Sequence, residues 1–178
     1  KLLQREYADY EQLARRRKLS KGVLRRQKEE VFERMPKISI VVPLYCTPKN
    51  YLDEMIASVQ KQSYTNWELC LSDGSGENSP LTKILNKYTK KDARIRVVHN
   101  QQQFHISENT NKALEICTGE YIAFMDHDDL LAPNALYECV RVLNEEPETE
   151  LIYSDEDKIN MDGTEYFQPH FKSDYNID

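Results

Sequence analysis

From Lys37 onward, apolar positions follow two alternating patterns. Short apolar runs rich in β-branched residues are typical of buried strands, and they occur at 38–42, 67–71, 94–99, 121–125 and 150–153. Between them, apolar residues recur at spacings of three and four, as on one face of a helix, at 50–59, 80–88, 107–117 and 133–143. The alternation predicts an α/β fold with a mostly parallel sheet and helices on both faces.

The two ends of the chain follow other patterns. Residues 1–34 have weak helical stripes broken near 19–22, which predicts a helical extension or linker over 1–36, ahead of one domain over 37–178. Near the C-terminus, short strand-like runs at 158–160 and 165–167 flank Met-Asp-Gly-Thr at 161–164, so we predict a β-hairpin there.

Acidic and small polar residues stand where the predicted strands end. They are Asp73, Gly74 and Ser75 after the second strand, Asp126, Asp128 and Asp129 after the fourth, and Asp155, Glu156 and Asp157 after the fifth. The carboxyl ends of parallel strands meet at one edge, which is where such sheets bind ligands. Three carboxylates within four positions repel unless water or a cation neutralises them. The alternative is a solvated turn in which Asp129 caps the next helix.

Charge narrows the ligand class. The net charge of -6 divides unevenly: residues 1–37 hold 12 Lys and Arg against 6 Asp and Glu, so the other 141 residues hold 12 against 24. Nucleic acid is therefore not an expected partner of the main body. The four cysteines form no metal-finger spacing, which favours free thiols in the cytoplasm. The basic cluster at 15–18 is expected to be a solvated face, although it could touch the inner face of a membrane.

The acidic edge suits a metal-bound diphosphate. Carboxylates separated by one residue can hold Mg²⁺ or Mn²⁺ and leave positions open for phosphate oxygens. The five glycines form no phosphate-binding loop that could replace the metal. Asp73 could accept hydrogen bonds from a nucleobase, and Tyr45 could lie against that base or be an ordinary exposed loop residue.

Several motifs together carry a resemblance to a known family. In chain order they are Ile40–Tyr45 (Ile-Val-Val-Pro-Leu-Tyr), Leu71–Ser75 (Leu-Ser-Asp-Gly-Ser), Asn111–Ala113 ahead of Thr118–Ile122, and Met125–Asp129 (Met-Asp-His-Asp-Asp). Over 37–178 the chain resembles family 2 glycosyltransferases of the GT-A fold. Tyr153–Lys158 and Pro169–Lys172 further resemble the rhamnosyltransferase-like branch of O-antigen and capsule synthesis.

The resemblance implies an inverting, metal-dependent transfer of a sugar from a nucleotide-diphosphate-sugar donor to a hydroxyl of a glycan or lipid-linked glycan. It places the nucleotide against Pro43, Tyr45, Asp73, Asn111 and Asp126. It makes Asp128 the metal ligand of the D-x-D motif, with Asp126 and Asp129 as further candidates for Mn²⁺ or Mg²⁺. Ser72, Thr110 and Ala113 depart from the family pattern, which more often has Asp, Arg and Gly there.

Catalysis itself is expected to need a segment that this chain lacks. The resemblance implies an N-terminal, donor-binding piece whose acidic general base lies beyond Asp178, with Asp155–Asp157 as weaker candidates for that role. Three other hypotheses stay open at this point: a non-catalytic nucleotide-binding or interaction fragment, a D-x-D phosphotransferase, and a sugar-nucleotide pyrophosphorylase.

Overall fold

The structure is a computed structural model that describes residue 10, residues 12–13 and residues 18–173. The chain divides into two compact units. One runs from Leu24 to Pro147, and the other combines Lys1–Val23 with Glu148–Asp178. The first unit holds the sheet and most of the core, and the second holds a β-hairpin.

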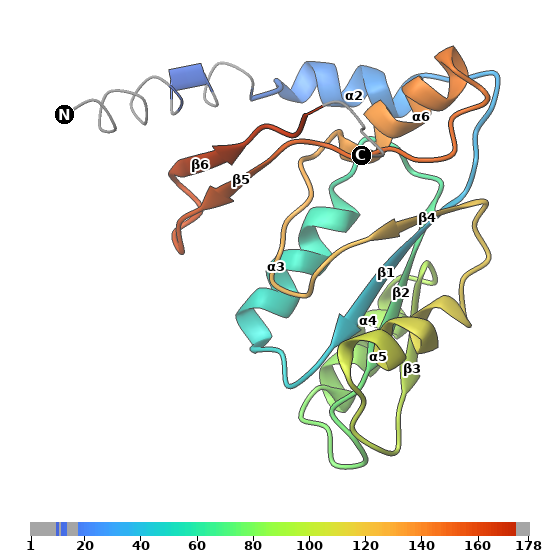
Figure 1. The fold of residues 1–178 in the computed structure, drawn as a ribbon, viewed down its shortest axis with the longest axis vertical. Helices are drawn as coiled ribbons and strands as arrows, with labels where there is room; N and C mark the ends of the chain where they lie inside the picture. Colours follow the sequence, from blue (N-terminus) through green and yellow to red (C-terminus); the bar gives the residue numbers. More distant parts are fainter. Residues whose placement is uncertain (1–9, 11, 14–17, 174–178) are drawn as a thin grey trace. The chain divides into compact units, whose positions relative to one another are not determined.

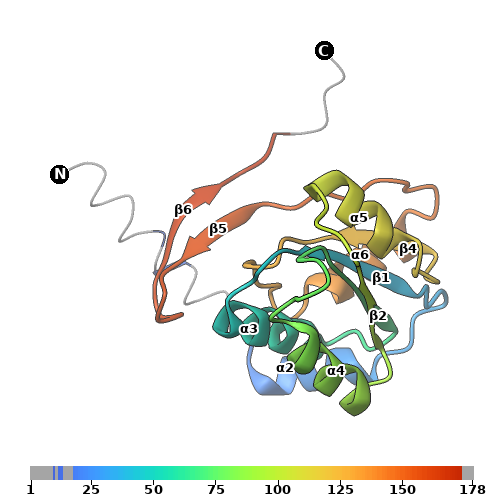
Figure 2. The same ribbon diagram turned by 90° about the horizontal axis from the view of Figure 1, so that it is seen from below.

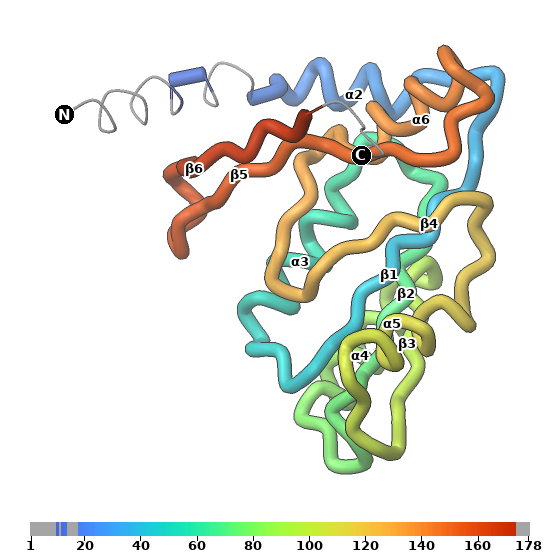
Figure 3. Tube along the Cα trace, in the orientation of Figure 1, coloured from blue at the N-terminus to red at the C-terminus, as the bar shows by residue number. Residues whose placement is uncertain are grey.

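A four-stranded parallel sheet forms the centre of the first unit. Its strands are β1 (Ile38–Leu44), β2 (Trp67–Asp73), β3 (Ile95–His99) and β4 (Tyr121–Phe124), in the spatial order β3-β2-β1-β4 (Figure 1). The connecting helices are α3 (Lys49–Gln60), α4 (Thr82–Lys91) and α5 (Ile106–Leu114), and α6 (Ala135–Glu145) follows β4. The trace runs from strand to helix to strand through this unit (Figure 3). The predicted parallel α/β fold is confirmed.

The two faces of the sheet differ in polarity. Alternate residues of β1, such as Ile38, Ile40 and Val42, enter a large apolar core shared with α3, α4 and α6. The apolar stripe of α3 lies fully inside this core, as its spacing predicts. Helix α5 covers the opposite face, and Figure 2 shows α5 and the pair α3 and α4 on opposite sides of the sheet. That second face carries Ser39 of β1 and Glu68 of β2, which hydrogen-bond to each other, and Ser72 of β2, which bonds to Asn109 of α5.

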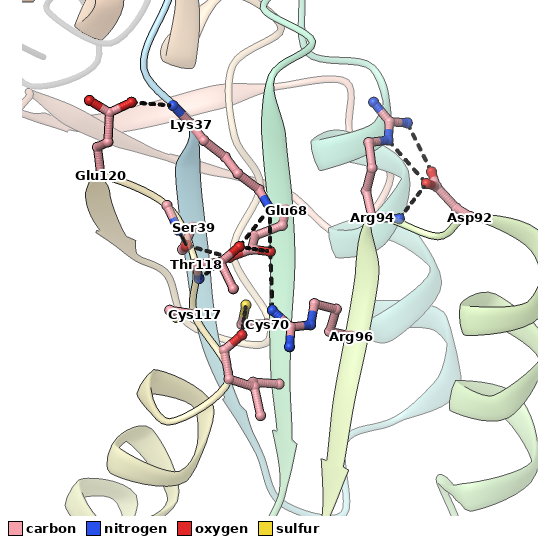
Figure 4. A network of polar contacts seen from close by, with 12 residues as sticks. Lys37, Ser39, Glu68, Cys70, Asp92, Arg94, Arg96, Cys117, Thr118 and Glu120 are labelled. Atoms are coloured by element: carbon pink, nitrogen blue, oxygen red, sulfur yellow. Dashed lines mark hydrogen bonds and ion pairs between the residues drawn. The ribbon is translucent and has the colours of Figure 1, made fainter.

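A buried carboxylate anchors the amino-terminal end of the second face (Figure 4). The Glu68 side chain is only 2% exposed and lies 2.8 Å from Lys37 Nζ and 3.4 Å from Arg96. It also accepts hydrogen bonds from the Ser39 hydroxyl and from the backbone and hydroxyl of Thr118. Burial alone would raise the pKa of Glu68, but the hydrogen bonds from Lys37, Ser39 and Thr118 prevail and lower it to about 2.

Gly119 allows β4 to approach this network. A Cβ at Gly119 would lie 2.6 Å from the Lys37 carbonyl oxygen and 2.6 Å from Ser39 Oγ. The Gly119 N–H donates to Ser39 Oγ at 2.8 Å. Any larger residue would therefore separate the start of β4 from β1.

Strand β1 continues through Pro43 to Leu44, two residues beyond its predicted end. The Val41 carbonyl accepts a hydrogen bond from the Met125 N–H, on the β4 side. Backbone groups of successive residues in a strand point alternately to its two neighbours, so the backbone of residue 43 also faces β4. Pairing between β1 and β4 ends at Val41 and Phe124. Pro43, which has no N–H, therefore lies just beyond the last paired residue of β1. At this position β4 offers no acceptor that would need an N–H from β1.

The predicted fifth strand at 150–153 is wrong, because these residues belong to no strand. The next strands are β5 (Glu156–Ile159) and β6 (Tyr166–His170), which pair with each other in antiparallel fashion in the second unit. This confirms the predicted hairpin. Its turn is closed by Asn160, whose side-chain oxygen accepts hydrogen bonds from the N–H groups of Thr164 and Glu165, and by Gly163 at φ 66°.

Among the described residues of the N-terminal segment, the helix prediction is confirmed at 10, 12 and 13 and over α2 (Lys21–Glu29). Helix α2 ends five residues before the predicted end at 34, because Phe32 leaves the helical path to pack against Tyr137 with ring centroids 5.3 Å apart. Glu30 also accepts a hydrogen bond from the Tyr137 hydroxyl at 2.8 Å. Residues 1–9, 11 and 14–17, which include most of the basic cluster, lie outside the described residues.

Candidate functional site

The strand order places a topological switch point between β1 and β4. Strands β1, β2 and β3 succeed one another in one direction across the sheet, whereas β4 lies on the other side of β1. Ligands of open parallel sheets bind just beyond the carboxyl ends of the strands at such a point. The residues that follow β1 and β4 here are Tyr45–Thr47 and Met125–Asp129.

Asp73 ends β2 beside this point and is 1% exposed. The Gly74 N–H donates to the Leu44 carbonyl at 2.9 Å, which ties the loop after β2 to the end of β1. The Ser75 N–H donates to Asp73 Oδ1 at 3.1 Å, and Ser75 Oγ accepts from the Cys46 N–H at 2.9 Å. Cys46 takes a positive φ of 45°, so the chain turns sharply here. The loops after β1 and β2 therefore form one connected rim.

The second carboxylate oxygen of Asp73 lacks a hydrogen bond. Asp73 Oδ2 is buried without a partner among the described residues, and His99 Nδ1 lies 3.5 Å away from it. His99 stands opposite Asp73 in the register of β2 and β3, and neither of its ring nitrogens has a hydrogen-bond partner among those residues. Buried polar atoms are nearly always satisfied in folded proteins. Asp73 Oδ2 is therefore a candidate acceptor for a polar ligand.

Three buried polar side chains support the Asp73 loop: Asn100 and Asn109, which the sequence prediction missed, and Ser72, which it noted only as a departure from the family pattern. Ser72 Oγ donates to Asn109 Oδ1 at 2.5 Å, and Asn100 Nδ2 donates to Ser72 Oγ at 2.9 Å. Asn109 Nδ2 donates to the Leu44 carbonyl at 2.9 Å. A signal for Asn109 existed, because it precedes the buried Ala113 by four residues and so lies on the same face of α5.

The acidic turn after β4 is open to solvent. Asp126, Asp128 and Asp129 are all exposed, and the Asp129 N–H donates to the Asp126 carbonyl at 3.3 Å, which closes the turn. Within the described residues, no cluster of three or more Asp, Glu, His or Cys could enclose a metal ion. Mg²⁺ and similar ions are often held by one or two carboxylates, with water and phosphate oxygens completing the shell. The donor set fits such a cation, and Asp128 and Asp126 would be its protein ligands.

The other predicted donor-site residues lie at different depths. Pro43 is partly buried within β1, and Tyr45 is 50% exposed directly after this strand, with its ring accessible. Asn111 is exposed on α5, whereas Asn109 is the buried asparagine of that helix.

Asp155, Glu156 and Asp157 do not follow a strand of the parallel sheet, contrary to the prediction, and they lie in the hairpin unit. Each engages a group of that unit. Asp155 Oδ1 accepts from the Lys172 N–H at 2.9 Å, Glu156 pairs with Lys172 Nζ at 3.3 Å, and Asp157 accepts from the Tyr10 hydroxyl at 2.6 Å. All three carboxylates are thus engaged within the hairpin unit rather than at the edge of the parallel sheet.

Comparison with known proteins identifies the family. The sequence matches the family model described as glycosyl transferase family 2 over residues 39–176. The chain belongs to glycosyl transferase family 2. An uncharacterized protein, y4gI, from Sinorhizobium fredii is 47% identical over 143 residues, which cover 80% of this chain and 16% of the relative. The O-antigen biosynthesis protein RfbC from Myxococcus xanthus is 33% identical over 145 residues, covering 82% of this chain and 11% of RfbC.

A solved structure with a similar sequence has the same fold. The S. aureus protein TarS, crystallised in complex with UDP, superposes with a TM-score of 0.53 and 26% identity, covering 61% of this chain and 32% of that chain. The family 2 chain described here thus has the GT-A architecture, and its family membership favours the glycosyltransferase hypothesis over a phosphotransferase or a pyrophosphorylase. It spans less than a fifth of the length of the two curated relatives. Among its described residues, no helix is long and apolar enough to cross a membrane.

Proposed function

We propose that this chain supplies the donor-binding part of an inverting glycosyltransferase. The enzyme transfers a sugar from a nucleoside diphosphate sugar to a hydroxyl group of a glycan or lipid-linked glycan. Asp73 receives the base, the exposed ring of Tyr45 lies against it, and Asp126 contacts the ribose or sugar. A divalent cation held by Asp128 binds the diphosphate and neutralises charge on the leaving group.

The carboxylate oxygen Oδ2 of Asp73 carries this proposal, because it has no hydrogen bond among the described residues and the His99 ring lies 3.5 Å from it. It is buried at the carboxyl edge of the sheet, in a loop tied to the end of β1, and β1 forms one side of the switch point. The exposed carboxylates of the turn 126–129 follow the strand on the other side. A base-binding acceptor after β2 and a cation-binding turn after β4, on either side of the end of β1, fit the two ends of a nucleoside diphosphate. The UDP bound to TarS in its crystal structure supports the same ligand class.

The biological setting is proposed from the relatives. The name of RfbC favours surface polysaccharide synthesis, with a growing glycan as the acceptor. Nucleic acid has no place in this proposal, because the main body of the chain is acidic. All four cysteines are free thiols, which favours the cytoplasm, where disulfides are rare. We place the general base that activates the acceptor hydroxyl in a segment beyond Asp178.

Calorimetric titration of the chain with UDP, TDP and GDP, each with and without Mn²⁺, tests the donor site. We expect one of the three nucleotides to bind more tightly than the others, and its binding to require Mn²⁺. Asp73→Asn should weaken binding of the preferred base by about 10- to 100-fold, since a charge-assisted hydrogen bond to a buried group contributes about 1.5–3 kcal/mol. Asp128→Asn should instead abolish the effect of Mn²⁺.

Asp162→Asn is a matched control, because it also removes one exposed carboxylate and lies in the hairpin turn of the other unit. It should bind nucleotide as the wild type does. Equal binding of all nucleotides by wild type and Asp73→Asn would contradict the assignment of Asp73. Metal-independent binding that Asp128→Asn leaves unchanged would contradict the cation site.

A further inference from the structure

We propose that Asn109 is a positioning residue that holds the Asp73 loop in its binding geometry, acting with Ser72 and Asn100. None of the motifs that mark the donor site includes Asn109 or Asn100. The identity of the ligand that this loop binds rests on the proposed function. The conformation of the loop does not, because it follows from the hydrogen bonds of Asn109, Ser72 and Asn100. The proposal therefore has a readout that needs no nucleotide.

Asn109 links α5 to the ends of two strands. It is 2% exposed, and its Nδ2 donates to the carbonyl of Leu44, the last residue of β1. Its Oδ1 accepts from the hydroxyl of Ser72, the residue before Asp73 in β2. One amide thus fixes the spacing between β1 and β2 at the point where both strands become loops.

Asn100 extends the cluster to the end of β3. Its Nδ2 lies 3.0 Å from the Asp73 carbonyl and 3.3 Å from Asn109 Oδ1, and its backbone N–H donates to the same Asp73 carbonyl at 3.1 Å. The Ser72 hydroxyl donates one hydrogen bond to Asn109 and accepts one from Asn100, so its donor is satisfied within the cluster. A buried polar network that is fully satisfied is rigid, and removing one member leaves buried groups unpaired.

Gly74 shows how closely the loop rests on this amide. A Cβ added to Gly74 would lie 2.7 Å from Asn109 Nδ2 and 2.8 Å from Asn109 Cγ. The position next to Asp73 therefore tolerates no side chain while Asn109 is present. The Asn109 amide is thus in direct packing contact with the backbone of the loop at Gly74.

The consequence for Asp73 is indirect. The Asp73 carbonyl is held by Asn100, and the N–H of the next residue, Gly74, is held by the same Leu44 carbonyl that Asn109 engages. With the backbone fixed on both sides, the Cα–Cβ direction of Asp73 is fixed too, and the hydrogen bond from the Ser75 N–H to Asp73 Oδ1 then orients Oδ2. Asn109 thereby sets the binding geometry without touching the ligand.

Asn109→Ala in the 178-residue chain tests the proposal by two measurements. Amide hydrogen exchange of Gly74 and Ser75 should accelerate by about tenfold or more relative to the rest of β2, because the carbonyl and carboxylate that these amides bond to lose their fixed positions. Affinity for UDP with Mn²⁺ should fall by about 10- to 100-fold, as expected for a displaced binding group. Asn109→Leu serves as a second variant, since it keeps about the size of the side chain and removes the hydrogen bonds to Leu44 and from Ser72 without adding a charge.

Ser39→Ala is the matched control. It also removes a buried polar group of the α5 face, but at the amino-terminal end of β1, next to Glu68. It should lower stability without changing exchange at Gly74 and Ser75 or nucleotide affinity.

A double-mutant cycle with Gly74→Ala separates positioning from general destabilisation. Gly74→Ala should weaken nucleotide binding because of the clash with Asn109, and in the Asn109→Ala background it should add little. Additive effects would overturn the proposal, as would unchanged exchange at Gly74 and Ser75 in both Asn109 variants. Failure of the wild type to bind any nucleotide would refute the proposed function instead, and the exchange result would then decide the role of Asn109.

Discussion

Glu68→Gln removes the charge of the buried carboxylate beneath α5 and changes little else about its size. In the folded protein the pKa of Glu68 is lowered from its ordinary value of 4.5 to about 2, which corresponds to about 3 kcal/mol of stabilisation at pH 7. Because the folded-state pKa is the lower one, this contribution is complete above pH 4.5 and is lost as the pH falls toward 2. The variant leaves Lys37 and Arg96 without their carboxylate partner.

We therefore expect Glu68→Gln to be about 3 kcal/mol less stable than wild type at pH 7, and only about 1.5 kcal/mol less stable at pH 3. Urea unfolding followed by tryptophan fluorescence measures this difference at each pH. Trp67 is the only tryptophan, is buried, and has the Arg94 guanidinium 3.7 Å from its ring centroid, so its emission should report unfolding.

The control is Glu145→Gln, which removes one charge from an exposed pair with Arg141. Exposed pairs contribute little, so this variant should stay within about 0.5 kcal/mol of wild type at both pH values. A gap between Glu68→Gln and wild type that is the same at pH 7 and pH 3 would refute the reasoning. It would mean that the variant is less stable because of altered packing, and not because the favourable interactions of the ionised Glu68 carboxylate are lost.

Three further outcomes are expected. Gly119→Ala should lower stability by about 1–3 kcal/mol, seen as a lower thermal midpoint, because the new methyl group meets the Lys37 carbonyl; an unchanged midpoint would show that β4 can shift freely. A maleimide at pH 7 should label the exposed Cys46 before Cys70, whose pKa is raised by burial; mass spectrometry that finds Cys70 labelled first in the native state would contradict this. Adding Mn²⁺ with the preferred nucleoside diphosphate should raise the thermal midpoint of the wild type but not of Asp128→Asn, and an equal rise in both would remove Asp128 from the cation site.

The sequence predicts the sheet well because its apolar runs are continuous. Ile38–Val42 and Trp67–Leu71 are buried on both faces, and such runs are distinct from the helical stripe of α3. The run at 150–153 is equally apolar, but it is exposed and unpaired as a strand. Hydrophobicity alone does not show whether a partner strand is available, so this prediction failed.

For the candidate site, the sequence predicts positions better than contacts. Asp73 is the last residue of β2 and Asp126–Asp129 follow β4, so both lie at the carboxyl ends of strands, as the alternation requires. Asn109 and Asn100 are different, because their importance depends on hydrogen bonds between residues 28 to 65 positions apart. A helix stripe predicts that Asn109 faces inward, but only the assembled sheet shows that it meets Leu44 and Ser72.

Pro43 limits how far β4 can follow its neighbour. It offers no hydrogen-bond donor on the β4 side, so that ladder closes with the bond from the Met125 N–H to the Val41 carbonyl. Released there, the chain turns instead of continuing straight. An extended chain would send Asp128 and Asp129 to opposite faces of the sheet. A proline in β1 thus lets the acidic residues that follow β4 share one exposed turn, although the two segments are some eighty residues apart in the chain.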